Sequence, residues 1–164
     1  MIKNLYVWDF DGTLIDSPLP EEGKPIWEKY HNTKYPHKGW WGREESLDPK
    51  VFEVKEIYGI REQYLSCKSD TEGKVIMLTS RLPKLKDLII YHLHKNNFEF
   101  DEYKFKCGGK EKSDQIDELL IKYPTINYVE VYDDRDKEIL LYKSWKPIRN
   151  IELKINQIYG RSKE

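Results

Sequence analysis

The chain has 164 residues, the length of one domain (1–164) with a sizeable core. Hydrophobic residues make up 38% and charged residues 35%, and the net charge of −1 gives no overall attraction to nucleic acid or membranes. Two cysteines, Cys67 and Cys107, are too few for a disulfide framework, and no apolar run approaches the length of a membrane span. We therefore expect a cytoplasmic protein without a membrane segment.

The first expected strand covers residues 2–9 and leads directly into the sequence Asp-Phe-Asp-Gly-Thr. Its apolar, β-prone residues are typical of a strand buried on both faces of a sheet. Asp9 and Asp11 at its end are one residue apart, and neighbouring carboxylates repel each other unless a cation or a reacting group lies between them. The pair therefore indicates a catalytic or metal site, the alternative being a surface turn.

Residues 15–59 are the least regular part of the chain. Three prolines within 15–25 indicate an irregular excursion, from which a short helix is expected to begin at Pro25 and end near Tyr30. A tryptophan-rich stretch follows. We expect the whole segment to be an irregular excursion within the single domain.

From residue 60 onward, helices and strands are expected to alternate. The expected elements are a helix at 60–69, a strand at 75–78, a helix at 85–93, a strand at 100–105, a helix at 116–123, a strand at 126–132, a helix at 139–142 and an edge strand at 151–155. This alternation predicts an α/β fold, a three-layer sandwich with a mostly parallel sheet. In such sheets, ligands bind beyond the carboxyl ends of the strands.

Polar clusters follow three of the expected strands. The clusters are Asp9 with Asp11, Thr79 with Ser80 and Arg81, and Asp133 with Asp134. Carboxylates without nitrogen or sulfur ligands suit a hard cation such as Mg²⁺, and a hydroxyl beside a cation is typical of a phosphate site. His92 and His94 do not share a helix face and are expected to be exposed to solvent. Zinc is therefore not expected.

The order of these motifs resembles the haloacid dehalogenase (HAD) superfamily of phosphotransferases over residues 5–136. The segments 75–81 and 131–135 look like the phosphatase domain of phage polynucleotide kinase-phosphatases, and the tryptophan-rich stretch adds a likeness to the HAD domain of Swiss-army-knife RNA-repair proteins. The resemblance implies a HAD-like Rossmannoid fold, in which residues 15–59 would form a flap and a small cap-like insertion within the single domain. It also implies a Mg²⁺-dependent phosphomonoester hydrolase with an aspartyl-phosphate intermediate, acting on a polynucleotide 3′-phosphate or a nucleotide.

The resemblance assigns the acidic residues to the reaction. Asp9 would be the nucleophile, and Asp11 would protonate the leaving oxygen and then activate a water molecule. Asp9, the main-chain carbonyl of Asp11 and Asp134 would hold Mg²⁺. Asp133 is the alternative to Asp134 as the metal carboxylate.

The resemblance also implies groups that bind the phosphate. Thr79 would donate a hydrogen bond to the phosphoryl group, and Lys112 would neutralise its charge. Lys106 and Lys110 are alternatives to Lys112, because all three lie in one lysine-rich stretch ahead of a helix.

Five residues are candidates for substrate recognition: Trp40, Trp41, Arg43, Ser80 and Arg81. The two tryptophans would stack on a nucleobase while Arg43 binds a phosphate, or they would pack the cap onto the sheet. Arg81 would contact a polynucleotide phosphate, or it would pair with Asp133 or Asp136.

Two other functions fit the same motifs, a small-metabolite HAD phosphatase and a catalytically inactive HAD-fold binding protein. The net charge of −1 argues against a long polynucleotide interface. The Asp9 and Asp11 pair argues against an inactive protein, because a binding module does not need the second carboxylate. The expected partners are a phosphorylated substrate, such as an RNA or DNA 3′-end or a nucleotide, and proteins of a repair pathway.

Overall fold

The computed structural model describes residues 1–163. The strands are β1 (Asn4–Trp8), β2 (Gly73–Leu78), β3 (Glu102–Lys104), β4 (Tyr128–Asp133) and β5 (Glu152–Gln157). The helices are α1 (Pro20–His31), α2 (Arg61–Ser69), α3 (Lys86–Lys95), α4 (Lys112–Lys122) and α5 (Asp136–Ser144), with 3₁₀ helices η1 (Glu44–Leu47), η2 (Pro83–Leu85) and η3 (Gly160–Lys163). None of the described helices has the length and apolar character needed to cross a membrane.

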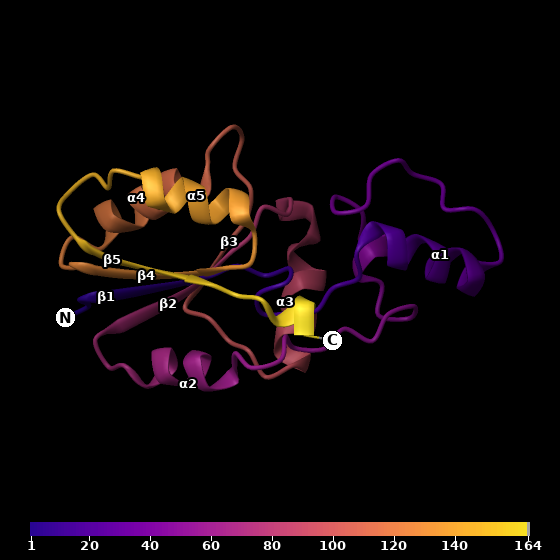
Figure 1. Ribbon diagram of the computed structural model, residues 1–164, viewed down its shortest axis with the longest axis horizontal. Coiled ribbons are helices and arrows are strands. Elements are labelled where there is room, and N and C mark those ends of the chain that lie inside the picture. Colours follow the sequence, from indigo (N-terminus) through magenta and orange to yellow (C-terminus); the bar gives the residue numbers. More distant parts are fainter. Residues whose placement is uncertain (164) are drawn as a thin grey trace.

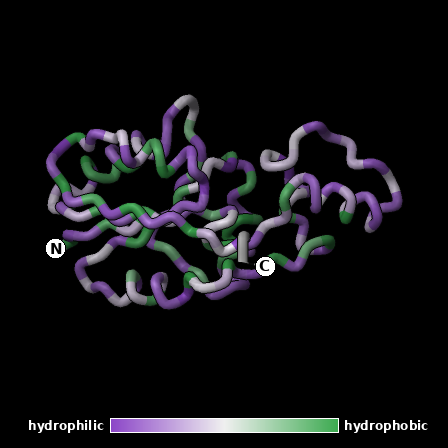
Figure 2. Tube along the Cα trace, in the orientation of Figure 1, coloured by the Kyte–Doolittle hydropathy of each residue, from purple (hydrophilic) through white to green (hydrophobic). Residues whose placement is uncertain are grey.

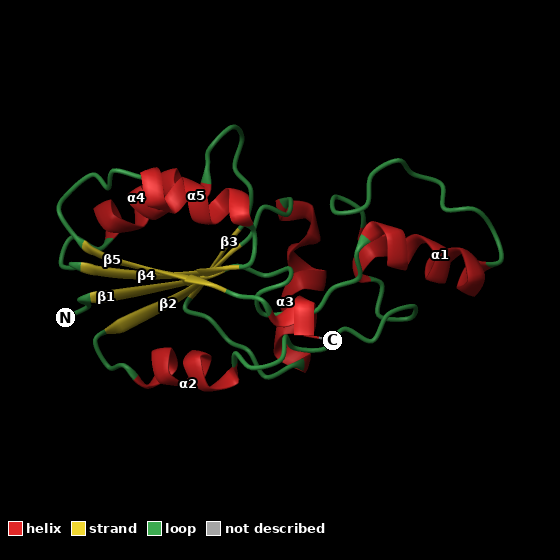
Figure 3. Cartoon of the chain, in the orientation of Figure 1, coloured by secondary structure: helices red, strands yellow, loops and turns green. Residues whose placement is uncertain are grey.

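The five strands form one sheet in the order β3-β2-β1-β4-β5 (Figure 3). Every described pair of neighbouring strands is parallel, which confirms the predicted parallel sheet and the edge position of β5. In the central strand β1, Trp8 lies opposite Met77 of β2 and Tyr132 of β4. The residues that follow these three strands are therefore brought to the same edge of the sheet.

Helices cover both faces of the sheet (Figure 1). Alternate residues of β1 point to opposite faces, so Leu5 and Val7 join a buried cluster with residues of α4 and α5. Trp8 belongs to a second cluster with residues of α2 and α3, and its ring stacks on that of Tyr132 at 3.8 Å. The predicted three-layer sandwich is confirmed.

Helix α1 and the loops around it lie beyond the carboxyl edge of the sheet, apart from the other helices (Figure 1). We refer to residues 15–59 as the cap segment. Its two ends are held together by an antiparallel bridge between Ile15 and Glu56 and by a hydrogen bond from the Asp16 amide to the Lys55 carbonyl, 2.8 Å long. The cap segment is therefore closed where residues 15–16 pair with residues 55–56. The loop after α1 is hydrophilic (Figure 2).

The start of α1 differs from the prediction. The helix begins at Pro20 rather than Pro25, and Pro25 lies inside it. Proline fixes φ near its helical value and is tolerated in the first turn, so Pro20 begins a helix where it was expected to mark irregular chain. Pro25 removes one main-chain donor from the exposed face of the helix.

The expected exposure of His92 is also wrong. Its side chain is buried, and its Nε2 lies 2.6 Å from the carbonyl oxygen of Leu47 in η1. The cap segment covers this face of α3, which the spacing of the two histidines on the helix does not reveal. His94 is exposed as predicted.

Candidate active site

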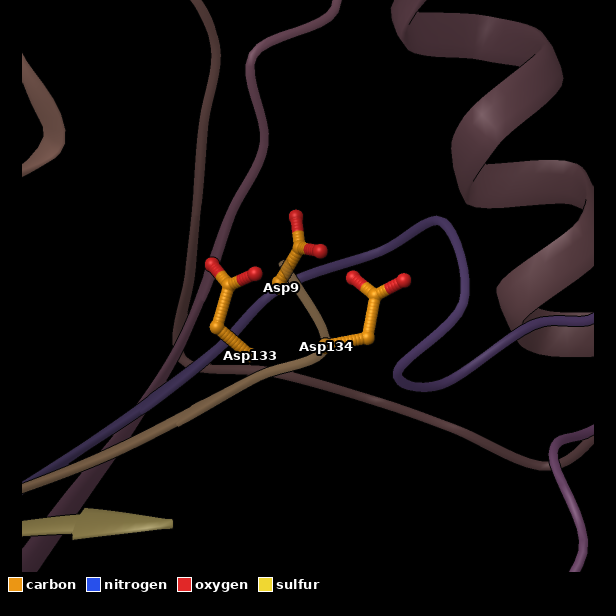
Figure 4. A group of neighbouring side chains, drawn as sticks. All are labelled: Asp9, Asp133 and Asp134. Carbon is orange, nitrogen blue, oxygen red and sulfur yellow. The ribbon is translucent and has the colours of Figure 1, made fainter. Parts of the chain in front are cut away.

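Three carboxylates meet where β1 and β4 end. One oxygen each of Asp9, Asp133 and Asp134 lies within 4.8 Å of the other two. Figure 4 shows the three side chains pointing to the same side, Asp9 from the end of β1 and the other two from the end of β4. The Asp9 amide donates to the Tyr132 carbonyl at 3.0 Å, which extends the pairing of the two strands to the site. This all-oxygen cluster could hold a divalent cation.

Burial and the charge of Asp133 disfavour the negative charge of both Asp9 and Asp134. Burial raises the pKa of Asp9 well above its ordinary value and Asp133 raises it further, whereas Lys112 opposes this effect. Burial and Asp133 also raise the pKa of Asp134, against the opposing charge of Arg161. The site therefore holds more negative charge than its buried surroundings stabilise, which favours binding of a cation.

Lys112 lies inside this cluster. Its Nζ donates to Asp9 Oδ1 at 2.9 Å and to Asp133 Oδ2 at 2.7 Å, and its side chain is buried. Although burial lowers its pKa, Asp9 and Asp133 raise that pKa well above the ordinary value. Lys112 is the first residue of α4, a position where the helix dipole disfavours a cation, so the two carboxylates offset that cost.

The other two candidate lysines lie elsewhere. Lys110 forms an exposed ion pair with Glu118, and Lys106 is an exposed residue on the edge of the cavity. The structure therefore brings Lys112 to Asp9. The structure also gives the two candidate metal carboxylates different surroundings. Asp134 lines the cavity, whereas Asp133 is buried and bound by Lys112.

Asp11 is held by Arg81 rather than by the acidic cluster. Arg81 donates from Nε to Asp11 Oδ2 and from Nη2 to Asp11 Oδ1, each at 2.8 Å. Although burial raises the pKa of Asp11, the Arg81 guanidinium and its hydrogen bonds lower it overall. The alternative in which Arg81 pairs with Asp133 or Asp136 is wrong, because the fold places the end of β2 beside Asp11.

Thr79 is buried at the end of β2 and lines the cavity beside the exposed Ser80. The Thr79 Oγ1 accepts a hydrogen bond from the Arg81 amide at 3.1 Å, so its proton is available to another acceptor. Thr79 and Ser80 both follow the end of β2 directly. They lie where the sequence pattern predicts a phosphate-binding hydroxyl.

A cavity of about 530 Å³ brings these groups together. Its lining includes the predicted residues Asp9, Asp11, Trp41, Thr79, Ser80, Arg81, Lys106, Lys112 and Asp134. Trp40 and Arg43 do not line it. Arg43 is exposed outside the cavity.

The two tryptophans have different surroundings. Trp40 is 3% exposed, packs against Phe52 and donates a hydrogen bond to the Pro18 carbonyl at 2.8 Å. Trp41 is 37% exposed, and its ring lies 5.1 Å from the guanidinium of Arg81. Trp40 therefore packs the cap, and only Trp41 presents a ring to the cavity.

Four further residues around the site are not among the predicted site residues: Thr13, Ser17, Ser46 and Arg161. The Thr13 hydroxyl lies 3.3 Å from Asp9 Oδ2, and the Ser17 hydroxyl donates to Asp11. Ser46 accepts a hydrogen bond from Arg81 at 2.6 Å, and Arg161 donates to Ser17 at 3.1 Å. Only Thr13 belongs to a recognisable motif, so the others could not have been found from spacing.

Comparison of the sequence with known proteins does not identify a family, because no model of a known protein family matches the chain. The chain is 25% identical to the uncharacterized protein YMR265C of Saccharomyces cerevisiae over 88% of its own length, and it spans only 37% of that protein.

Several solved structures have a similar fold. A Thermotoga maritima protein named as a β-phosphoglucomutase has a TM-score of 0.56 and 20% identity, covering 86% of this chain and 81% of that one. A chain of the Pnkp1/Rnl/Hen1 complex has a TM-score of 0.56 and 17% identity over 97% of this chain and 46% of that one. The haloacid dehalogenase-like hydrolase SP0104 of Streptococcus pneumoniae has a TM-score of 0.54 and 14% identity, covering 85% and 79% of the two chains.

The chain therefore has the HAD-like α/β fold that the sequence predicted. One of these structures is named as a hydrolase and another as a phosphoglucomutase, and identities at or below 20% show the fold alone.

Proposed function

We propose that this protein is a Mg²⁺-dependent phosphatase that hydrolyses phosphate monoesters through a covalent intermediate on Asp9. The main support is the convergence of a carboxylate nucleophile, a second carboxylate, a hydroxyl and a lysine on one cavity. These groups are Asp9 and Asp11, which follow β1, Thr79, which follows β2, and Lys112, the first residue of α4. Together they supply the nucleophile, proton transfer and charge stabilisation that phosphoryl transfer requires.

Asp9 and Asp134 are the side chains that would hold Mg²⁺, with the main-chain carbonyl of Asp11 as the third ligand that the resemblance implies. Their oxygens fit a hard cation, and burial, followed by the negative charge of Asp133, raises the pKa of both carboxyl groups. When bound, the ion would offset the repulsion between the carboxylate and the phosphate.

The chain's own residues account for the bond changes. A carboxylate oxygen of Asp9 would bond to phosphorus while the bond from phosphorus to the leaving oxygen breaks, with a proton passing from Asp11 to that oxygen. A water molecule would then bond to phosphorus, losing its proton to Asp11 and releasing Asp9. The Arg81 pair favours the ionised form of Asp11, which suits this second half, so the first half requires Asp11 to take up a proton.

We propose a polynucleotide 3′-phosphate or a nucleotide as the substrate. Trp41 and Leu82 line the cavity and are 37% and 38% exposed, which offers an apolar surface for a base. Lys106 and Arg135 add exposed positive charge to the same cavity. The repair-pathway partners and the cytoplasmic location stay predictions.

Hydrolysis of p-nitrophenyl phosphate with Mg²⁺ tests the activity. Asp9→Asn is expected to abolish turnover while leaving the fold intact, as measured by circular dichroism. Borohydride treatment of acid-quenched wild-type protein is expected to convert residue 9 to homoserine, as for an acyl phosphate. Absence of turnover with Mg²⁺, Mn²⁺ and Co²⁺ would contradict the proposal.

A substrate panel tests the class of substrate. It compares 3′-phosphate oligonucleotides, 5′-phosphate oligonucleotides, mononucleotides and sugar phosphates by kcat/KM. The proposal expects a 3′-phosphate oligonucleotide or a nucleotide to be hydrolysed best. A sugar phosphate that exceeds both by more than tenfold would favour the small-metabolite alternative.

A further inference from the structure

Arg161 reaches the cavity from the segment after β5. The Ile158 amide donates to the Asp133 carbonyl at 2.8 Å, and Ile158 itself is buried. Gly160 packs so closely that an added Cβ would lie 2.0 Å from a methyl carbon of Ile57. These contacts fix the chain beside the carboxyl edge of the sheet. The position of Arg161 is therefore set by the fold.

The guanidinium of Arg161 has an unused donor. Its Nη2 donates to the Ser17 hydroxyl at 3.1 Å, but its Nε is buried and has no hydrogen-bond partner in the described chain. Within that same part of the chain, Arg161 forms no ion pair, in contrast to Arg81 and Lys112. A buried donor without a partner is costly, so this group is suited to an anionic ligand.

The location of Arg161 indicates which part of a substrate it would contact. A Cβ on Gly12 would lie 2.9 Å from Arg161 Nε and 2.2 Å from Asp134 Oδ2, so the guanidinium borders the acidic cluster. Ser17 links it to Asp11, because the Ser17 hydroxyl donates to that carboxylate. Asp11 is the proposed proton donor to the leaving oxygen, which places Arg161 on the leaving-group side.

In the proposed reaction, Thr79 and Lys112 bind the phosphate that is transferred. A positive charge on the leaving-group side is therefore useful when the leaving group is itself anionic. We propose that Arg161 binds a second phosphate carried by the leaving group, such as the phosphodiester next to a terminal 3′-phosphate. This inference rests on the proposed function, and it makes Arg161 a specificity-determining residue for substrates with two phosphates.

Two thymidine substrates separate this role from a general one. Thymidine 3′-phosphate has a single phosphate, whereas the thymidine dinucleotide with a 3′-phosphate also has a phosphodiester. Arg161→Gln is expected to raise the KM of the dinucleotide about tenfold more than it raises the KM of the mononucleotide. Arg161→Lys is expected to restore part of the loss. Lys143→Gln, which removes an exposed charge from α5, is the matched control and is expected to change neither substrate.

Equal losses on both substrates, or no loss on either, would overturn the inference. Equal losses with a lowered melting temperature would assign Arg161 a structural role instead. Calorimetric binding of the dinucleotide to Asp9→Asn, with and without Arg161→Gln, keeps this test independent of turnover. A tenfold weaker affinity would support the inference even if wild-type protein hydrolysed no substrate, whereas equal affinity would overturn it.

Discussion

Arg81 joins the carboxylate of Asp11 to the cap segment. Two hydrogen bonds of 2.8 Å bind Asp11, while Nη1 of the same guanidinium donates to the Trp41 carbonyl at 2.9 Å and to Ser46 Oγ at 2.6 Å. Arg81 is 3% exposed, so these contacts replace nearly all of its hydration. The position of the proposed proton-transfer group therefore depends on the cap being closed over the sheet edge.

Arg81→Lys is expected to lower kcat for p-nitrophenyl phosphate about tenfold to a hundredfold, because an ammonium cannot form both parallel hydrogen bonds to Asp11. The free energy of unfolding is expected to fall by about 3 kcal/mol, because Asp11 and Ser46 lose their partner. Steady-state kinetics and urea denaturation measure the two effects.

Arg149→Lys is a suitable control, because Arg149 donates to three carbonyls, those of Leu120, Tyr123 and Ile126. That variant is expected to lose stability without losing kcat. An Arg81→Lys protein with wild-type kcat would contradict the assigned role of the Asp11 pair.

Removal of metal is expected to abolish turnover, and Mg²⁺ is expected to raise the melting temperature of the wild-type protein. Asp134→Asn is expected to weaken Mg²⁺ affinity at least tenfold, because Asp134 lines the cavity. Thermal shift against Mg²⁺ concentration gives the affinity without requiring activity.

The neighbouring variant Asp133→Asn distinguishes the two carboxylates. It is expected to reduce stability without added metal, because Lys112 would lose one of its two buried acidic partners. An Asp134→Asn protein with unchanged Mg²⁺ affinity would instead make Asp133 the metal carboxylate.

The adjacent tryptophans are expected to respond differently to alanine. Trp40→Ala is expected to lower the free energy of unfolding by about 3–5 kcal/mol, because it removes a buried ring of the cap. Trp41→Ala is expected to change stability by less than about 1 kcal/mol and to raise KM for a nucleotide several-fold. Urea denaturation and kinetics on both variants measure this contrast, and an unchanged KM for Trp41→Ala would exclude stacking on that ring.

His92 is expected to make stability depend on pH. Burial lowers its pKa below the ordinary value of about 6.5, and its buried Nδ1 has no partner among the described residues. The unfolded chain therefore takes up a proton at a higher pH than the folded protein. The stability from the neutral ring is fully present above about pH 6.5 and is lost as the pH falls from there through the lowered folded pKa.

The variant His92→Gln retains a donor for the Leu47 carbonyl but removes the titrating group. Its free energy of unfolding is expected to fall less than that of the wild type between pH 7 and pH 5. His94→Gln, at an exposed position of the same helix, is expected to keep the wild-type slope. Identical slopes for all three proteins would exclude His92 as the source.

Much of the layered fold could be predicted from local patterns. The apolar runs before Asp9, Thr79 and Asp133 read as buried strands, and the helical spacing around Leu119 marks α4. Alternation of the two patterns is sufficient for a parallel sheet, because parallel strands need crossover helices. The predicted start of α1 at Pro25 is wrong, because proline is common both in irregular segments and at helix N-termini.

Local sequence patterns are enough to predict which residue types follow β1, β2 and β4, because each strand end is defined by neighbouring residues and its polar cluster comes directly after it. The partners of these residues depend on the three-dimensional packing: Lys112 for Asp9, Arg81 for Asp11, and Arg161 for the cavity. These contacts join residues 70 or more positions apart or come from the segment after β5, and no periodicity encodes them. They arise because packing brings strands, α4 and the cap to one edge of the sheet.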